Sequence, residues 1–117
     1  MAFGLFATLS GCDQTEAPAG QRVVAGNVEA GRVVIAQVKC GVCHSIPGVT
    51  GAKGIVGPPL EEFGRRQFIA GFLPNQPSLL ARWVREAPSL VPETGMPDMP
   101  LSEEQARDVA AYLYTLR

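Results

Sequence analysis

The sequence predicts an all-α domain of three main helices joined by long loops, and three observations predict it. Three segments repeat apolar residues at intervals of three and four, the spacing that gives a helix one buried face. No segment shows the alternation of a half-buried strand or the residues of a tight hairpin turn. The 117 residues include 13 glycines and 10 prolines, a content typical of extended loops. A chain of this length forms one domain with a small core.

The first helix is expected over about residues 28–39, with Asn27 as its N-cap. Its apolar face consists of Gly31, Val34, Ile35 and Val38. A glycine inside a helix costs about 0.5–1 kcal/mol relative to alanine. Gly31 therefore indicates that a bulky group crosses the helix closely at this point.

The second helix is expected over about residues 77–87, because Pro88 cannot continue it. Its buried side consists of Leu79, Leu80, Trp83 and Val84. The third helix follows Ser102, which forms a capping box with Gln105. Its buried stripe consists of Ala106, Val109, Ala110, Leu113 and Leu116. A shorter turn is expected around residues 61–64.

The N-terminus divides into two further segments. Residues 1–11 are uncharged and apolar and are predicted to be the remnant of a signal peptide. The sequence LSGC, which ends at Cys12, resembles the lipobox of bacterial lipoproteins, in which the cysteine is acylated. The alternative is that Cys12 is an incidental small residue. Residues 12–26 are polar or small and are predicted to be a flexible tether, which leaves residues 27–117 as the folded domain.

Composition excludes several classes of protein. Ten basic and eleven acidic side chains give a net charge of −1, so the chain has no basic surface for nucleic acid. No segment approaches the roughly 18–20 apolar residues of a membrane span. There is one histidine, His44, which excludes a Cys2His2 zinc site, a bis-histidine haem and a three-histidine zinc centre.

The sequence CGVCH at residues 40–44 is the motif that indicates a functional site. A CxxC pair alone is compatible with a redox dithiol, half of a zinc site or half of a haem attachment. Structural zinc requires four N or S ligands, and Cys12 lies across the tether. A thioredoxin-like dithiol usually opens a helix after a strand, whereas this pair follows a predicted helix. His44 favours a c-type haem, bound through thioethers to Cys40 and Cys43 with His44 as an axial iron ligand.

The second axial ligand of an electron carrier must then come from another side chain. Met96 and Met99 both lie in a proline-rich loop about fifty residues after His44. A methionine in such a loop is less easily explained as core packing than one on a helical stripe. A thioether ligand raises the reduction potential of the iron. We favour Met96 as the ligand, with Met99 as the alternative.

These motifs together resemble those of a class I (mitochondrial/bacterial-type) monohaem cytochrome c over residues 27–117. The similarity extends to the C-terminal cytochrome domain of some bacterial cytochrome oxidase subunits II. The sequence GPPL at residues 57–60 resembles the family's GPxL loop, which implies that the Pro58 carbonyl accepts the Nδ1–H of His44. The sequence TGMP at residues 94–97 resembles the axial-methionine loop and supports Met96. The resemblance implies a small cytochrome c fold, with three main helices and long Gly/Pro-rich loops wrapped around one covalent haem.

Roles are also expected for other residues, some from the resemblance and some from their chemistry. The sequence LPNQP at residues 73–77 resembles the start of a helix that closes one side of the haem pocket, where Trp83 contacts the porphyrin or a propionate. The sequence AAYL at residues 110–113 resembles the terminal helix, which implies that Tyr112 packs on Gly31. Arg65 and Arg66 are candidate partners of the haem propionates, with a solvated pair as the alternative. The residues expected to line the pocket or the core are Phe63, Phe68, Ile69 and Phe72. Tyr114 and Arg117 are expected at the surface.

The function expected from these features is one-electron transfer rather than catalysis, because both axial positions are filled. The expected partners are a quinol:cytochrome c reductase, a terminal oxidase or a periplasmic dehydrogenase, reached by apolar docking on the periplasmic side of a bacterial inner membrane. Acylation of Cys12 would anchor the protein there as a monomer or a complex subunit. Two alternatives remain open. One is a gas sensor or peroxidase-like protein with a displaceable ligand, and the other is a fixed electron-relay subunit of an oxidase or dehydrogenase complex.

Overall fold

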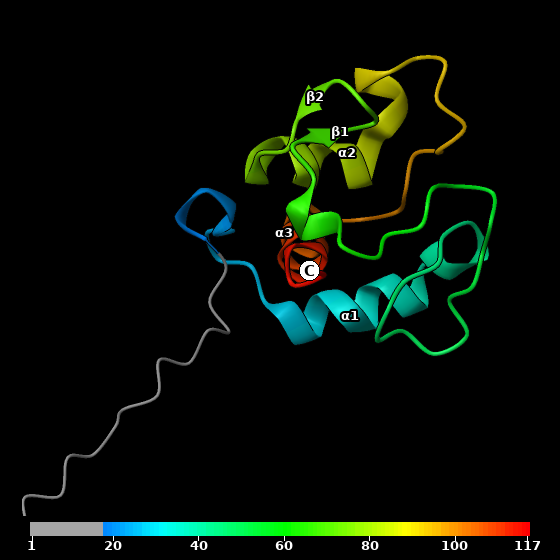
Figure 1. The fold of residues 1–117 in the computed structure, drawn as a ribbon, viewed down its shortest axis with the longest axis horizontal. Helices are drawn as coiled ribbons and strands as arrows, with labels where there is room; N and C mark the ends of the chain where they lie inside the picture. The colour runs from blue at the N-terminus through cyan, green and yellow to red at the C-terminus, as the bar shows by residue number, and fades with distance from the viewer. Residues whose placement is uncertain (1–17) are drawn as a thin grey trace, which may run out of the picture.

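The computed structural model describes residues 18–117, so the predicted signal remnant and Cys12 lie outside the described residues. Its main elements are helix α1 (Val28–Gln37), strand β1 (Phe68–Ile69), strand β2 (Leu73–Pro74), helix α2 (Pro77–Leu90) and helix α3 (Glu103–Tyr114). Short 3-10 turns are η1 (Ala19–Gln21), η2 (Cys40–Val42) and η3 (Phe63–Arg65). In Figure 1, α3 is seen almost end-on between α1 and α2. The three predicted helices are therefore confirmed, with α3 at the centre.

Helices α1 and α3 cross at Gly31, where the sequence predicted a close crossing. A Cβ built on Gly31 would lie 2.5 Å from the carbonyl carbon of Asp108 and closer still to its oxygen. The atoms nearest to this position belong to the backbone of α3 at Asp108 and Val109, so the close approach that requires Gly31 is between the two helix backbones. The buried Asp108 carboxylate accepts the backbone N–H of Asn27 at 2.8 Å and joins the two helices again at the start of α1.

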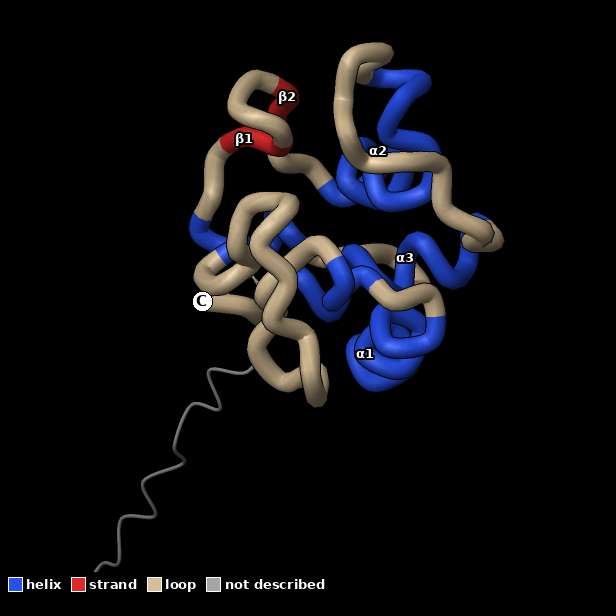
Figure 2. Tube along the Cα trace, turned by 90° about the vertical axis from the view of Figure 1, so that its right-hand side faces the viewer, coloured by secondary structure: helices blue, strands red, loops and turns tan. Residues whose placement is uncertain are grey.

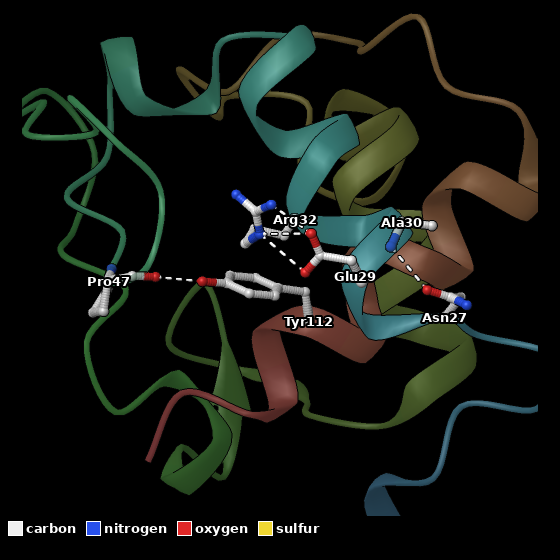
Figure 3. Close-up of polar contacts among 6 residues, drawn as sticks. All are labelled: Asn27, Glu29, Ala30, Arg32, Pro47 and Tyr112. Carbon is white, nitrogen blue, oxygen red and sulfur yellow. Dashed lines mark hydrogen bonds and ion pairs between the residues drawn. The ribbon is translucent and has the colours of Figure 1, made fainter.

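Tyr112 links α3 to the loop after α1. Its hydroxyl donates to the Pro47 carbonyl at 2.5 Å, as Figure 3 shows. Burial raises the pKa of this phenol. The same view shows the Asn27 side chain accepting the Ala30 N–H at 2.8 Å, which confirms the predicted N-cap. Glu29 pairs with Arg32 on the exposed side of α1, where an ion pair contributes little to stability.

Helix α3 begins with the predicted capping box, in which Ser102 and Gln105 each bond the other's backbone N–H. All five predicted stripe residues are buried. Tyr114, however, is 1% exposed rather than a surface residue. Its hydroxyl donates to Asn75 at 3.0 Å, and burial raises its pKa to about 12. The prediction failed because the chain before α2 folds back over the end of α3.

The chain before α2 contains a hairpin that the sequence did not predict. Strands β1 and β2 pair antiparallel over two residues each, too few to show a period-two pattern in the sequence. Ala70 and Gly71 turn the chain with positive φ values of 53° and 84°. Successive strand residues face opposite sides, so Ile69 is buried while Phe68 is 51% exposed. Phe72 is 59% exposed, and neither phenylalanine is the core or pocket residue that was expected.

Helix α2 extends three residues past the predicted end at residue 87, but its backbone is broken. Glu86 has non-helical angles (φ −142°, ψ 52°), two residues before Pro88. The regular part of the helix thus ends where the proline predicts, and one further turn follows. Figure 2 shows α2 and the hairpin on one side of the molecule and α1 with α3 on the other.

The segment before α1 lies against the domain over its described part. The Gln21 side chain donates to the Gly64 carbonyl at 2.6 Å, and Val23 packs against the core. Arg117, exposed as expected, hydrogen-bonds to Gln21. Gln21 and Val23 of the predicted tether are therefore in contact with the domain. No helix within residues 18–117 is long and apolar enough to cross a membrane.

Candidate functional site

The CGVCH sequence forms its own turn directly after α1. Lys39 adopts a left-handed conformation (φ 62°), which ends the helix before the cysteines. The 3-10 turn η2 then brings the His44 N–H to the Cys40 carbonyl at 3.0 Å. Helix α1 is therefore two residues shorter than predicted, and Cys40, Cys43 and His44 leave it as one compact unit.

A second loop runs alongside this turn and holds the histidine ring. The Gly57 N–H donates to the Cys43 carbonyl at 2.7 Å, and the Gly54 N–H donates to the His44 carbonyl at 3.2 Å. A Cβ on Gly57 would lie 2.7 Å from Nδ1 of His44. Glycine is therefore required here, because any side chain would displace the imidazole.

The hydrogen bond of the His44 ring defines which nitrogen is free. Nδ1 lies 2.7 Å from the Pro58 carbonyl oxygen, the contact that the resemblance implied. A carbonyl only accepts, so Nδ1 carries the proton and Nε2 keeps its lone pair. A metal-binding histidine commonly has this arrangement, with the second nitrogen donating to a carbonyl. His44 is thus prepared to bind a metal through Nε2.

One apolar cavity of about 590 Å³ collects most of the predicted site residues. It is bounded by the segment after α1, by α2 and α3, and by the loop between α2 and α3, which approach one another in Figure 1. The predicted site residues that line it are Cys40, Cys43, His44, Pro58, Arg66, Trp83 and Met96. Met99 lines it too, so both candidate methionines reach the same cavity as His44.

The two cysteines are free thiols at this cavity. Burial raises the pKa of Cys40 above its ordinary value, so its neutral form is favoured at neutral pH. Within residues 18–117, no three His, Cys, Asp or Glu side chains converge to hold a metal ion.

Arg65 and Arg66 are neighbours in the sequence, but their side chains lie in different surroundings. Arg66 lines the cavity, donates to the Pro59 carbonyl and lies 5.6 Å from the ring centroid of Phe63. Arg65 does not line the cavity but pairs with Glu62 at 3.4 Å on the surface, so it is not placed as a haem partner. In a 3-10 turn, residues three apart lie above one another. The turn η3 therefore directs Arg65 toward Glu62.

The cavity also includes residues that no sequence motif indicated. Val56, Ala70 and Leu101 line it from three different loops. Phe63 and Ile69, which were expected there, are buried and line it as well. No periodic pattern marks a loop residue as cavity-lining, since its direction depends on the loop's own conformation.

The comparison with known families agrees with this geometry. The family model for cytochrome c matches residues 28–117. The chain belongs to the cytochrome c family. Membership implies a covalently bound haem c and a role in haem-based electron transfer.

This cytochrome c domain is similar to part of a larger protein. A cytochrome c oxidase subunit 2 of Alkalihalophilus pseudofirmus is 38% identical over 88 residues, which are 74% of this chain. This chain spans only 25% of that relative.

Two solved structures share the fold. The c-type cytochrome SorU from Sinorhizobium meliloti has a TM-score of 0.54 and 22% identity, over 76% of this chain and 88% of that one. SoxXA from P. pantotrophus has a TM-score of 0.60 and 24% identity, over 78% of this chain and 82% of that one.

The residues of the cavity fit a haem c. Its volume of about 590 Å³ lies within the range of roughly 300–1,000 Å³ for cofactor sites. Its walls are mainly apolar, as a porphyrin requires, while Arg66 supplies a cation for a carboxylate. The two thiols and the free Nε2 of His44 stand at the same cavity.

Proposed function

We propose that this protein is a one-electron carrier with a single haem c, attached through Cys40 and Cys43 and ligated by His44 and Met96. One observation supports the proposal most. The two thiols, the oriented imidazole and the methionine loop all line one apolar cavity. A haem held by these residues would supply reversible one-electron exchange between the ferric and ferrous states.

The chain's own residues tune such a centre. The Pro58 carbonyl holds the His44 ring in one orientation. The same hydrogen bond makes the Nε2 lone pair a stronger ligand for a metal ion. The Met96 sulfur, a soft ligand, favours the ferrous state. The buried aliphatic walls, such as Leu80 and Val84, exclude water and thereby favour the state of lower charge.

Arg66 is proposed to pair with a haem propionate. Its position beside Phe63 and the Pro59 carbonyl limits its movement, so the guanidinium is preorganised. Arg65 pairs with Glu62 outside the cavity and is not expected to reach a propionate. Trp83 is proposed to contact the porphyrin from α2.

The proposed partners are redox proteins, namely a quinol:cytochrome c reductase, a terminal oxidase or a periplasmic dehydrogenase. Val42 and Val56 line the cavity and are 67% and 82% exposed, and Ile55, which precedes Val56 in the sequence, is 93% exposed. A net charge of −1 supplies no strong charged surface. Docking is therefore proposed to be apolar and weakly dependent on salt.

A fixed electron-relay subunit is the second candidate function. The stretch that is 38% identical to a cytochrome c oxidase subunit 2 favours it. Both candidates place the domain on the periplasmic side of a bacterial inner membrane. The lipobox-like sequence that ends at Cys12 supports an anchor there and a boundary after residue 11. The proposed boundary at residue 26 rests on the polar and small residues that precede it.

Redox titration with and without carbon monoxide tests the carrier function against sensing or peroxidase chemistry. The haem-loaded protein is expected to titrate reversibly as one electron per chain. The ferrous form is expected to keep its spectrum under carbon monoxide at neutral pH, because Met96 fills the position that the gas would take. Rapid carbon monoxide binding by the unmodified protein would contradict the carrier function and favour a displaceable ligand.

A further inference from the structure

The break in α2 has a definite cause in the sequence. Pro88 has no backbone N–H, and its ring would collide with the Val84 carbonyl in a regular helix. The chain avoids this collision by leaving helical geometry at Glu86. A further turn then forms, closed by the Val91 N–H bonding to the Ala87 carbonyl at 2.9 Å.

The break makes a helix carbonyl available to a distant loop. In a continuous α-helix, the Arg85 carbonyl would accept the N–H of Ser89, four residues later. In this structure, it accepts the Met99 N–H at 2.9 Å. The Thr94 N–H bonds to the Val91 carbonyl at 3.0 Å. The loop of residues 94–99 is thus held at its start by Val91, the residue that follows α2, and at its end by Arg85 within α2.

Met96 lies between these two attachments. Within the loop, its N–H bonds only to the nearby Thr94 hydroxyl, at 3.2 Å. Pro97 and Pro100 restrict the backbone on either side of Met99. Fixing the Met99 backbone therefore fixes Met96, three residues away, at the cavity that both side chains line.

Side chains around the break contribute less to the non-helical geometry at Glu86 than Pro88 does. Ser89 donates to the Glu86 carbonyl at 2.7 Å, and Arg82 pairs with the Glu86 carboxylate at 2.8 Å. Both contacts are solvent-exposed or nearly so, and an exposed ion pair contributes little to stability. The loss of helical geometry is thus set by the backbone of Pro88.

We propose that Pro88 is a positioning residue for the axial-methionine loop. It keeps α2 open at Glu86, so that the Arg85 carbonyl holds Met99 and, through it, Met96. This inference rests on the proposed ligation by Met96. Without Pro88, the Ser89 N–H competes with the Met99 N–H for the same carbonyl, and the loop detaches more often.

Two measurements on the haem-loaded variant Pro88→Ala test this role. Hydrogen–deuterium exchange of the Met99 amide in the ferrous protein is expected to accelerate about two- to tenfold, the range for loss of one net hydrogen bond. The affinity of the ferric protein for imidazole, which competes with the Met96 sulfur, is expected to rise by a similar factor. Pro92→Ala is the matched control, because Pro92 lies outside α2 and precedes the same loop.

Either of two results would overturn the proposal. One is a Met99 exchange rate and an imidazole affinity equal to those of Pro92→Ala. The other is a uniform acceleration of all amides, which would mean that Pro88 affects only global stability. If Met96→Ala leaves the spectrum unchanged, the proposed ligation fails, while Met99 exchange still decides whether Pro88 holds the loop.

Discussion

The double variant Cys40→Ala/Cys43→Ala, produced without haem, is expected to lose cooperative folding. The cavity of about 590 Å³ is walled by residues of all three helices, including Ile35, Leu80 and Leu113. At about 24 cal/mol per Å³, a cavity of that volume left unfilled would cost on the order of 14 kcal/mol. That cost is similar to the whole stability of a small domain, roughly 5–15 kcal/mol. The cofactor is therefore expected to form most of the core.

Thermal unfolding followed by far-UV circular dichroism measures this loss. The control is Cys12→Ala, which removes a cysteine outside the described residues and is expected to keep the haem and the transition. Adding free haem to the double variant should restore part of the helical signal, because His44 and the apolar walls remain. A sharp transition in the haem-free variant, near that of the haem protein, would refute a haem-dependent core.

The variant Gly31→Ala is expected to destabilise the protein by about 1–3 kcal/mol, the usual cost of overpacking. Helix propensity alone predicts the opposite sign, since alanine is favoured over glycine by about 1 kcal/mol. The added Cβ would overlap the Asp108 backbone carbonyl, which no side-chain rearrangement relieves. Helices α1 and α3 would have to separate.

Urea unfolding of the haem protein provides the measurement. The reverse change at an exposed position of the same helix, Ala36→Gly, isolates propensity and is expected to cost about 1 kcal/mol. An increase in stability for Gly31→Ala would show that the two helices are not in close contact at this residue.

The helices could be predicted because their patterns are local. The capping box at Ser102 and the apolar stripe of α3 are set by neighbours within a few residues. Gly31 even indicated a close crossing, but the sequence did not show whether a side chain or the backbone of α3 made it. The two-residue strands and the burial of Tyr114 depend on contacts between distant segments, so no periodic signal marked them.

The candidate site also combines features that the sequence predicts with features that depend on distant contacts. The spacing of Cys40, Cys43 and His44 predicts haem attachment, because that chemistry depends on adjacent residues. The different positions of Arg65 and Arg66 could not be predicted, since the turn η3 decides which side chain reaches the cavity. The attachment of the methionine loop to α2 joins segments whose relation only the folded chain reveals.

Absorption spectra of the oxidised protein, Met96→Ala and Met99→Ala test His44/Met96 ligation most directly. The unmodified protein is expected to show a low-spin spectrum with the weak far-red sulfur-to-iron band. Met96→Ala is expected to lose that band and to bind carbon monoxide when reduced, whereas Met99→Ala keeps the band, since its sulfur is not the ligand. Loss of the band in Met99→Ala alone, or its absence from the unmodified protein, would contradict the assignment of Met96.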